Sequence, residues 1–508
     1  GGSGGAKARR DSSGAGLGRG AWGFGTGGSM RSRLVRVVAV ADVRAHSRSR
    51  LAQIPQQILH ASSSSTSLEV FDDWRSIVDV AGRFDAVVIA LPDREHREAA
   101  AHFLSLGLHI LLEKPMATTL LDCYHIVLKC REQQQQNKQT AQRSVNAVCH
   151  VLRYFAPCLK LKQLIDSGLV GQVVNINHTE PVGHWHFAHS FVRGNWHNEA
   201  ASAPSLLAKC CHDIDLLVYW MRGAGNDTSG ARRVKSVSSF GSLLHFRESN
   251  APPGSTNNCF TCPAEPQCPY SAKQLYVDKS RGQSTGWTGS VVLQAELANN
   301  LDHQLSQSDI EDLLAKADEE TRARLLEKCL RNEARTSYGR CVYRMGDNDV
   351  CDNQVVSMQF ESGATATLTL VGSSRDVLVR QTRVYGTRGE LTWNEALAPN
   401  QIVHDDFRSG QRTLIDYEPV LSSVFDFEVE ENAESVSAHQ TAGGISGWDY
   451  YLMHAFVEAV RTGEQSLVPT DLENALDSYV AVFAAEHARR TNTVVEIDRF
   501  RQQQHLHC

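Results

Sequence analysis

The stretch Gly107–Pro115 (GLHILLEKP) decides the fold class, because a short apolar run is followed at once by a charged pair and a proline. Its apolar part, 108–112, has the length and composition of a buried strand. Phe84–Leu91 (FDAVVIAL) is a second continuous apolar strand, and helical spacing from 94 to 106 fills the interval between the two. Apolar strands that alternate with helices are typical of a parallel sheet with both faces covered.

This alternation extends in both directions along the chain. Leu34–Val43 (LVRVVAVADV) and Val145–Val151 are predicted strands, and a helix is expected over about 119–132. The glutamine tract 133–136 that follows is expected to be a surface loop. These elements predict an α/β domain with a Rossmann-type, doubly wound parallel sheet, which binds ligands at the carboxyl ends of its strands. The residues at those ends are Asp42, Pro92, Glu113 and Lys114.

The second half of the chain has a different pattern. Alternating apolar and polar residues recur in several segments, as expected for a mainly antiparallel, open sheet with one solvated face. These segments are 173–176, 354–360, 364–371 and 380–385, and helices are expected at 205–221, 306–334 (an insert), 448–462 and 471–490. We therefore expect a disordered Gly-rich tail (1–12), a Rossmann-like domain (13–152) and an α+β domain for substrate binding and oligomerisation (153–508).

Composition restricts the class of protein. The chain has 508 residues, 42% hydrophobic, and 51 basic against 57 acidic residues, a net charge of −6 that argues against a nucleic-acid or membrane-surface partner. No run reaches the roughly 18 apolar residues of a membrane-spanning helix. The 13 cysteines are odd in number and include the adjacent pair Cys210–Cys211, and residues 1–30 lack an apolar signal region. We expect a cytoplasmic protein.

A glycine-rich motif near the start is a candidate dinucleotide site. The Gly-rich stretch that begins at Gly14 contains a G-x-G-x-x-A pattern in the register Gly16, Gly18 and Ala21, in which glycines let the backbone approach a pyrophosphate. Asp42 follows at a strand end, where a carboxylate accepts both ribose hydroxyls and so favours NAD. Arg44 and Arg48 keep NADP open. The alternative is a chance match in a glycine-rich tail.

No apolar strand precedes this motif, so the central position of the parallel sheet is expected to be empty. Either the gene model is faulty at its start, or cofactor binding is impaired.

Two segments contain groups suited to proton transfer and to hydrogen bonding with a substrate hydroxyl. Lys114, in Glu113-Lys114-Pro115, follows a strand directly, and Pro115 restricts the backbone there and is a candidate for a cis bond. In the helix predicted over 206–220, Lys209 and His212 share a face with Asp213 and Leu216. An imidazole is a natural proton acceptor near neutral pH. The structural alternatives are a surface turn for the lysine and a buried core histidine for His212.

These residues resemble the Gfo/Idh/MocA family (glucose–fructose oxidoreductase, inositol dehydrogenase and relatives). The resemblance is carried first by Asp85–Pro92 with His96 and by Gly107–Pro115. It extends through Arg153-Tyr154, Gly168 with Gly171, Trp196, and the run His212-Asp213-Ile214-Asp215. The similarity covers about residues 34–220 well and 336–492 more loosely.

The resemblance implies an NAD(P)-dependent oxidoreductase, a homodimer or homotetramer, that transfers hydride between nicotinamide and a hydroxyl-bearing carbon of a sugar, polyol or related cyclic alcohol. His212 would accept the hydroxyl proton and Lys114, oriented by Glu113, would stabilise the developing alkoxide. Leu91, Pro92 and His96 would lie at the cofactor. The substrate would meet Arg153 and the loop 183–196, which supplies His186, His189, Arg193 and Trp196; the alternative for that loop is a structural aromatic turn.

One position departs from the family pattern. Many members have Asp four residues before the histidine, where this chain has Ala208. Lys209, next to it, is expected to take over a substrate contact, or else the proton relay differs.

Two other functions stay open. An NAD-retaining glycosidase would oxidise its sugar transiently and cleave by elimination, and His439 with Gly443-Gly444 before Trp448-Asp449 is similar, imperfectly, to the loop of that branch. A non-catalytic nucleotide-binding scaffold is favoured by the degraded start of the chain.

A cysteine-rich loop has partial zinc-ligand spacing. Cys259-x2-Cys262-x5-Cys268 offers three thiolates, and Cys341 or Cys351 could be a fourth ligand only through long-range folding. The sequence predicts either a structural zinc site or a loop of free cysteines.

Overall fold

The computed structural model describes eleven segments of the chain. These are residues 37–42, 68–140, 144–222, 233–278, 288, 291–292, 318–332, 336–377, 379–394, 396–417 and 447–504. The glycine motif with Gly14, Gly16 and Gly18, the arginines at 44 and 48, and the 439–444 segment lie outside these residues.

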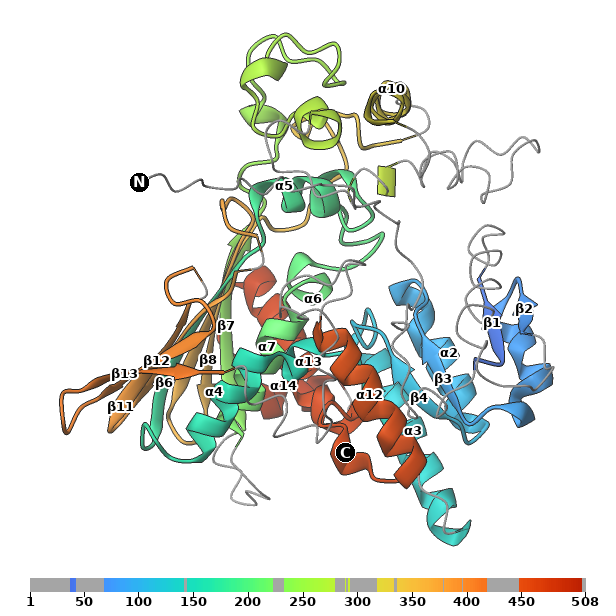
Figure 1. The fold of residues 1–508 in the computed structure, drawn as a ribbon, viewed down its shortest axis with the longest axis vertical. Helices are drawn as coiled ribbons and strands as arrows, with labels where there is room; N and C mark the ends of the chain where they lie inside the picture. Colours follow the sequence, from blue (N-terminus) through green and yellow to red (C-terminus); the bar gives the residue numbers. More distant parts are fainter. Residues whose placement is uncertain are drawn as a thin grey trace, which may run out of the picture.

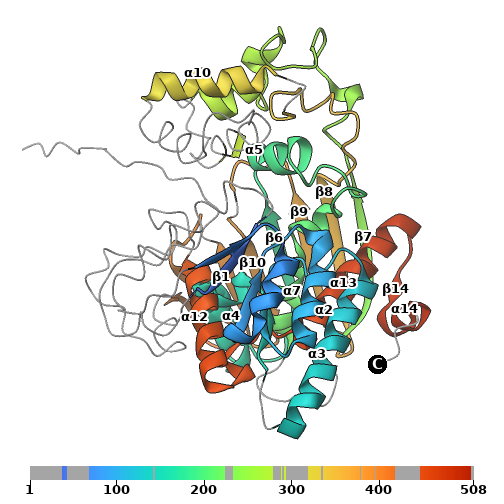
Figure 2. The same cartoon turned by 90° about the vertical axis from the view of Figure 1, so that its right-hand side faces the viewer.

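The first part contains five short parallel strands. They are β1 (Ala39–Ala41), β2 (Glu69–Phe71), β3 (Ala86–Ile89), β4 (His109–Leu112) and β5 (Asn146–Val148). The connecting helices are η3 (Trp74–Arg83), η4 (Asp93–Glu95), α2 (His96–Ser105) and α3 (Leu120–Thr140). Helices α2 and α3 pack against each other, and Figure 2 shows them side by side. This confirms the predicted α/β domain, because buried apolar strands alternate with helices.

The parallel strands form two sheets rather than one. Strands β1 and β2 pair with each other, and β3, β4 and β5 form a separate sheet in that order. Within the part of the chain that the structure describes, no strand pairs with both β1 and β3 to join the two sheets. Val88 of β3 is 37% exposed, whereas Ile110, Leu111 and Leu112 of β4 are fully buried. Strand β3 is therefore an edge strand, as expected for a sheet that lacks a central member.

The second part is built on a nine-stranded sheet, drawn at the left of Figure 1. Its strand order is β13-β12-β11-β10-β6-β9-β8-β7-β14, and every pair is antiparallel except β6 with β9. The strands are β6 (Val173–Pro181), β7 (Val234–Ser242), β8 (Asn353–Phe360), β9 (Thr365–Val371), β10 (Gln381–Gly386), β11 (Gly389–Asn394), β12 (Gln401–Asp406), β13 (Arg412–Asp416) and β14 (Val495–Glu496). Exposed and buried residues alternate along β8, which confirms the predicted open, mainly antiparallel sheet.

A layer of helices separates this sheet from the parallel strands (Figure 1). It consists of α4 (Ala156–Asp166), α7 (Cys211–Met221) and α13 (Leu472–Thr491), which pack on the sheet, with α12 (Gly447–Thr462) and η5 (Val151–Tyr154) beside them. Trp220 of α7 and Trp393 of β11 are fully buried in the core. The remaining helical segments are α5 (His184–Phe187), η6 (Ala188–Arg193), α6 (Ser205–Ala208), η7 (Glu248–Asn250), η8 (Glu265–Gln267), η9 (Lys273–Val277), α10 (Glu319–Leu330), η11 (Gln465–Leu467) and α14 (Ile497–Gln503).

The glutamine tract is helical, so the surface loop predicted at 133–136 is wrong. Helix α3 continues to Thr140, and Gln133 is only 2% exposed. Its amide donates to the Leu108 carbonyl at 2.8 Å and accepts from Asn146 at 2.8 Å. Glutamine is a good helix former, and its long amide satisfies backbone and side-chain groups at the sheet edge. No helix in the described residues is long and apolar enough to cross a membrane.

Candidate active site

The ends of β3 and β4 are held together by a buried histidine. Strand β4 runs into Glu113, Lys114 and a cis peptide bond at Lys114–Pro115. His96, fully buried at the start of α2, places Nδ1 2.8 Å from the Pro115 carbonyl and Nε2 2.9 Å from the Leu91 carbonyl. It therefore fixes the two strand ends relative to each other, and this lets the lysine side chain emerge in a defined direction.

Lys114 reaches across to the second part of the protein. Its Nζ donates to the main-chain carbonyl of Ala208 at 3.0 Å. That carbonyl is accessible because the helix breaks between α6, which ends at Ala208, and α7, which begins at Cys211. The continuous helix predicted over 205–221 is therefore wrong at this point, and Lys209 and His212 do not lie along one uninterrupted helical face. No glycine or proline marks the break in the sequence, so only the tertiary contact reveals it.

His212 lies at the start of α7, in contact with a second histidine. The Nδ1 atoms of His212 and His150 are 3.3 Å apart, and the rings pack edge to face. Burial, together with the nearby charge of Lys114 and the His150 ring, holds the pKa of His212 well below its ordinary value. The imidazole is therefore neutral near pH 7 and available to accept a proton.

His150 is itself followed by a buried carboxylate. Its Nε2 lies 3.9 Å from Asp215 Oδ1, and both side chains are inaccessible to solvent. Burial lowers the pKa of His150 to about 4, although the Asp215 charge opposes this. The order of groups is thus His212, His150 and Asp215, leading from the strand ends into the core.

Acid should destabilise the protein through this neutral histidine. Its pKa is lower in the folded state than the ordinary 6.5, so the unfolded chain binds the extra proton first and stability falls as pH drops from about 6.5 to 4. We expect the free energy of unfolding to lose about 2 kcal/mol per such histidine between pH 7 and pH 5. Urea unfolding of wild type and His150→Gln at both pH values measures this. An equal loss in the variant would assign the acid sensitivity to other groups.

Lys209 is held by a buried ion-pair network. Its Nζ lies 3.6 Å from Glu180 Oε1, and Arg380 lies 3.1 Å from Glu180 Oε2 and 2.6 Å from Asp213 Oδ1. Burial lowers the pKa of Lys209, and the charge of Glu180 opposes this. Asp213 also accepts from His178 at 3.0 Å, so it belongs to the support of the site and not to the ligand-facing surface.

Of the aromatic loop, His186 is the residue that lies near both lysines. Burial and the charges of Lys209, His189 and Lys114 hold the pKa of His186 well below its ordinary value. The side chains of Lys114, Lys209 and His186 are partly exposed, so a ligand can reach them. The structure thus brings together three of the residues predicted from the sequence, with His212 behind them.

Other predicted substrate residues have structural contacts instead. Arg153 forms a bidentate pair with Asp215, with both N–O distances 2.7 Å, and is 1% exposed. His189 is buried against Tyr276 and Tyr338. Arg193 lies beside Cys259, and Trp196 packs against Phe191. In this structure the side chains of Arg153, His189 and Arg193 are buried on protein partners, so they are not presented to a substrate as the sequence prediction expected.

The described cofactor residues fit a dinucleotide at the carboxyl edge. Asp42 directly follows β1, and its main-chain N–H donates to Phe71 at the end of β2. Lys114 follows β4, and its partly exposed ammonium can serve a ribose hydroxyl. Glu113 accepts from the main-chain N–H of Lys114 at 3.2 Å, and burial raises the pKa of this carboxyl. Among the contacts described, Glu113 therefore holds the main chain of Lys114 and not its ammonium group.

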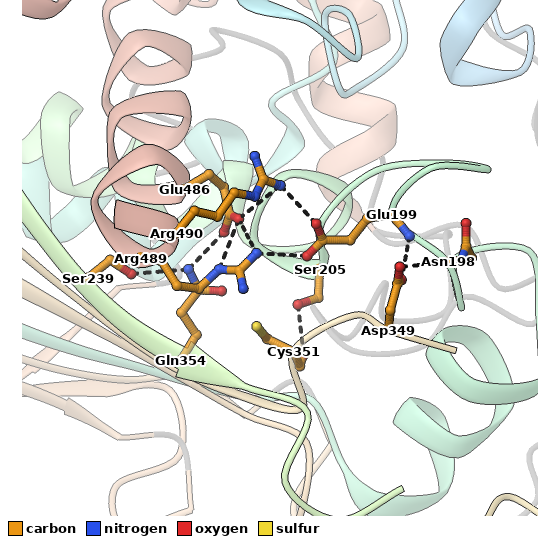
Figure 3. A network of polar contacts seen from close by, with 10 residues as sticks. All are labelled: Asn198, Glu199, Ser205, Ser239, Asp349, Cys351, Gln354, Glu486, Arg489 and Arg490. Carbon is orange, nitrogen blue, oxygen red and sulfur yellow. Dashed lines mark hydrogen bonds and ion pairs between the residues drawn. The ribbon is translucent and has the colours of Figure 1, made fainter. Parts of the chain in front are cut away.

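A second network fixes the segment just before the helix break (Figure 3). Glu199 accepts from Arg489 at 2.7 Å and Arg490 at 2.8 Å, both on α13. Ser205 Oγ donates to the carbonyl of Cys351 at 2.7 Å. These contacts connect the segment around Glu199 and α6 to α13 and to Cys351 just before β8, and so they hold the Ala208 carbonyl that accepts from Lys114.

The cysteine-rich loop forms a separate pocket. Cys259, Cys262, Cys268 and Cys341 all line it, whereas Cys351 does not. The described residues contain no group of three or more His, Cys, Asp or Glu arranged to hold a metal ion, and none of the twelve described cysteines forms a disulfide. The four cysteines predicted as zinc ligands thus line one pocket, but they do not form a preformed ligand set, and the zinc site stays a prediction.

Two residues of the site were missed from the sequence. His150 follows β5, so its position at a strand's carboxyl end was a usable signal. Glu180 lies in β6, within an alternating strand pattern, and nothing local distinguishes it from a surface carboxylate. Its complete burial depends on Lys209 and Arg380, which come from distant segments.

Comparison with protein families gives a match over the first part. Residues 15–140, which include Gly16 and Gly18, match the model of an oxidoreductase family with an NAD-binding Rossmann fold, Gfo/Idh/MocA. The chain is 22% identical over 391 residues to a protein named as an oxidoreductase, YteT, of Bacillus subtilis (strain 168), covering 76% of this chain and 74% of that protein. It is 27% identical over 164 residues to inositol 2-dehydrogenase 2 of Saccharopolyspora erythraea, covering 32% of this chain and less than half, 42%, of that protein.

Solved structures have a similar fold over most of the chain. Levoglucosan dehydrogenase in complex with NADH and L-sorbose superposes with a TM-score of 0.56 at 14% identity, covering 91% of this chain and 89% of that one. An oxidoreductase domain protein from Kribbella flavida gives a TM-score of 0.57 at 13% identity, covering 91% and 90%. At these identities the likeness establishes the fold. Residues 15–140 thus match the model of the Gfo/Idh/MocA family of NAD-binding oxidoreductases, and the described residues share the fold of these solved structures, a Rossmann domain followed by an open, mainly antiparallel sheet.

Proposed function

We propose that this protein transfers a hydride between NAD and a hydroxyl-bearing carbon of a sugar, polyol or related cyclic alcohol. The observation that supports this best is the convergence of Lys114, from the cofactor-binding part, with Ala208 and His212, from the second part. A cation beside a neutral imidazole is the pair that alcohol oxidation needs, because an alkoxide develops as the proton leaves.

His212 is the proton acceptor, and the histidine behind it sets its tautomer. The Asp215 carboxylate, 3.9 Å from His150 Nε2, favours a proton on that nitrogen. His150 Nδ1 then carries a lone pair and accepts from His212 Nδ1–H across the 3.3 Å contact. His212 Nε2 is left with its own lone pair, which is the form that takes a proton from a hydroxyl.

Lys114 positions the hydroxyl and stabilises negative charge on its oxygen. Among the described residues its Nζ makes one hydrogen bond, to Ala208, so N–H groups remain for a ligand. The main-chain carbonyl takes the place of the carboxylate that many relatives have at this position. NAD, when bound, supplies the nicotinamide ring that accepts the hydride.

The substrate class rests on the relatives. Their names include inositol 2-dehydrogenase and levoglucosan dehydrogenase, both of which act on ring-shaped, hydroxyl-rich compounds as their names state. Two features of this chain support the same class: His186 and Lys209 offer polar groups beside Lys114. Asp42, at the end of β1, favours NAD over its 2′-phosphorylated form.

The proposal is tested by steady-state assay of the full chain with NAD⁺ and a panel of cyclic polyols and anhydrosugars. Net NADH formation with at least one of them is the expected result. Release of sugar from a glycoside without net NADH would identify the NAD-retaining glycosidase instead. Saturable NAD⁺ binding with neither reaction would favour the scaffold.

A further inference from the structure

The cysteine pocket assembles thiols from two distant segments. Cys259, Cys262 and Cys268 come from the loop after β7, and Cys341 comes from the segment after α10. Backbone hydrogen bonds join the two segments: the Cys259 N–H donates to the Gly339 carbonyl at 3.0 Å, and the Cys341 N–H donates to the Asn257 carbonyl at 2.7 Å. The four thiols are thus placed together by the fold.

A buried guanidinium in the same pocket lacks a carboxylate partner. Arg193 is 1% exposed and lines the pocket. Its Nε donates to the Arg340 carbonyl at 2.8 Å, and one terminal nitrogen donates to the Tyr270 carbonyl at 2.6 Å and approaches Cys259 Sγ at 3.5 Å. The other terminal nitrogen has no partner within hydrogen-bond distance. The Tyr276 phenol acts on the guanidinium, but no carboxylate forms an ion pair with it among the described residues.

A buried, unpaired positive charge is costly, so a negative group is expected beside it. Glu265, a carboxylate that lines the pocket, accepts hydrogen bonds from Ser271 and Gln274, and no ion pair among the described residues joins it to Arg193. The groups with the largest electrostatic effect on Arg193 are the thiols of Cys259, Cys268 and Cys341 and the phenol of Tyr276. Neutral thiols do not supply the missing charge. A metal ion that holds the four thiols as thiolates does.

We propose that the pocket binds one zinc ion through Cys259, Cys262, Cys268 and Cys341, with Arg193 as its counter-charge. Four thiolates and Zn²⁺ carry a net charge of −2, which the guanidinium partly offsets, and the protons of the thiols are released on binding. Backbone N–H groups already point at two of the sulfurs, Tyr270 N–H at Cys268 and Tyr343 N–H at Cys341, as is usual around metal thiolates. Since the thiols line the pocket without a preformed ligand set, binding requires their side chains to rearrange.

The role of this zinc is structural and independent of hydride transfer. The loop 251–278 has only single turns of 3₁₀ and π-helix, η8 and η9, so little regular hydrogen bonding holds it. It packs against the buried ring of His189 and against α10 through Tyr276 and Leu330. A closed four-thiolate site would fix this loop over α5 and η6, the segment that carries His186.

The test is metal analysis of the full-length protein, purified under reducing conditions without chelator. We expect about one zinc per chain, and Co²⁺ added to the metal-free, reduced protein should give the strong sulfur-to-metal charge-transfer absorption of tetrahedral thiolate coordination. The probes are Zn²⁺ and Co²⁺ alone. Less than about a tenth of an equivalent of zinc, with no Co²⁺–thiolate absorption, would overturn the proposal.

Variants locate the site. Cys262→Ser and Cys268→Ser change partly exposed positions and should lose the zinc, whereas Cys329→Ala, which lies in the neighbouring core but not in the pocket, should keep it. Arg193→Met should weaken zinc binding by about 10- to 100-fold in competition with a chromophoric chelator. Full zinc content in both serine variants would also overturn the assignment. A cysteine variant that fails to fold leaves the wild-type cobalt spectrum as the deciding measurement.

Discussion

Lys114→Met is expected to lower kcat by about two or more orders of magnitude while leaving the protein folded. The methionine fills a similar volume but has no N–H to place on the Ala208 carbonyl or on a substrate hydroxyl, and it removes the positive charge beside His212. The alkoxide that forms during oxidation then lacks its electrostatic partner. The measurement is kcat and KM for NAD⁺-dependent oxidation of a substrate identified with the wild type.

A matched control is Lys129→Met. This lysine lies on the exposed surface of α3, where it pairs with Glu132. Its replacement should leave kcat unchanged, because exposed pairs contribute little. If Lys114→Met retained kcat within a factor of two, Lys114 would not belong to the reaction.

Asp215→Ala is expected to destabilise the protein by about 3–5 kcal/mol. Asp215 is fully buried and accepts two hydrogen bonds from Arg153, each 2.7 Å long, and a third from Ser478 at 2.8 Å. Burial by itself would raise the pKa of Asp215, but the charge and hydrogen bonds of Arg153 bring it below its ordinary value. Alanine leaves the arginine buried without a counter-charge. Urea unfolding, followed by circular dichroism, measures the loss.

Two further variants separate this charge effect from a simple packing defect. The double variant Arg153→Met/Asp215→Leu removes both charges and should recover most of the lost stability. Asp405→Ala, which breaks the surface pair with Arg412, should cost less than about 1 kcal/mol. An Asp215→Ala protein with an unchanged unfolding midpoint would contradict the assignment of Asp215 and Arg153 as a buried structural pair.

Much of the fold could be predicted from the sequence because its strands are short and strongly patterned. Continuous apolar runs such as Phe84–Leu91 are typical of buried parallel strands, and alternation along 354–360 is typical of a sheet with one open face. The break between Ala208 and Cys211 could not be predicted, since no helix-breaking residue marks it. The glutamine tract was misjudged because polarity indicated a loop, whereas Gln133 is used to satisfy buried polar groups.

Site residues that directly follow a strand could be predicted from the sequence. Residues whose role depends on whether their side chain is buried could not. Lys114 follows β4, and a lysine at that edge is informative by position alone. Arg153 and Arg193 carry the guanidinium group that a sugar site would use. Only the structure shows that Arg153 pairs with Asp215 inside the protein and that Arg193 lies in the cysteine pocket. Sequence spacing does not report what a long side chain reaches.

The most direct test of the central claim is a fluorescence titration of the folded, full-length protein with NADH, with NADPH in parallel. The account places the dinucleotide at Lys114, at the strand ends fixed by His96, and at Asp42 after β1. If this site is correct, the folded chain binds the dinucleotide. The account predicts saturable enhancement of NADH emission, tighter than that of NADPH. Folded protein that binds neither nucleotide would contradict it.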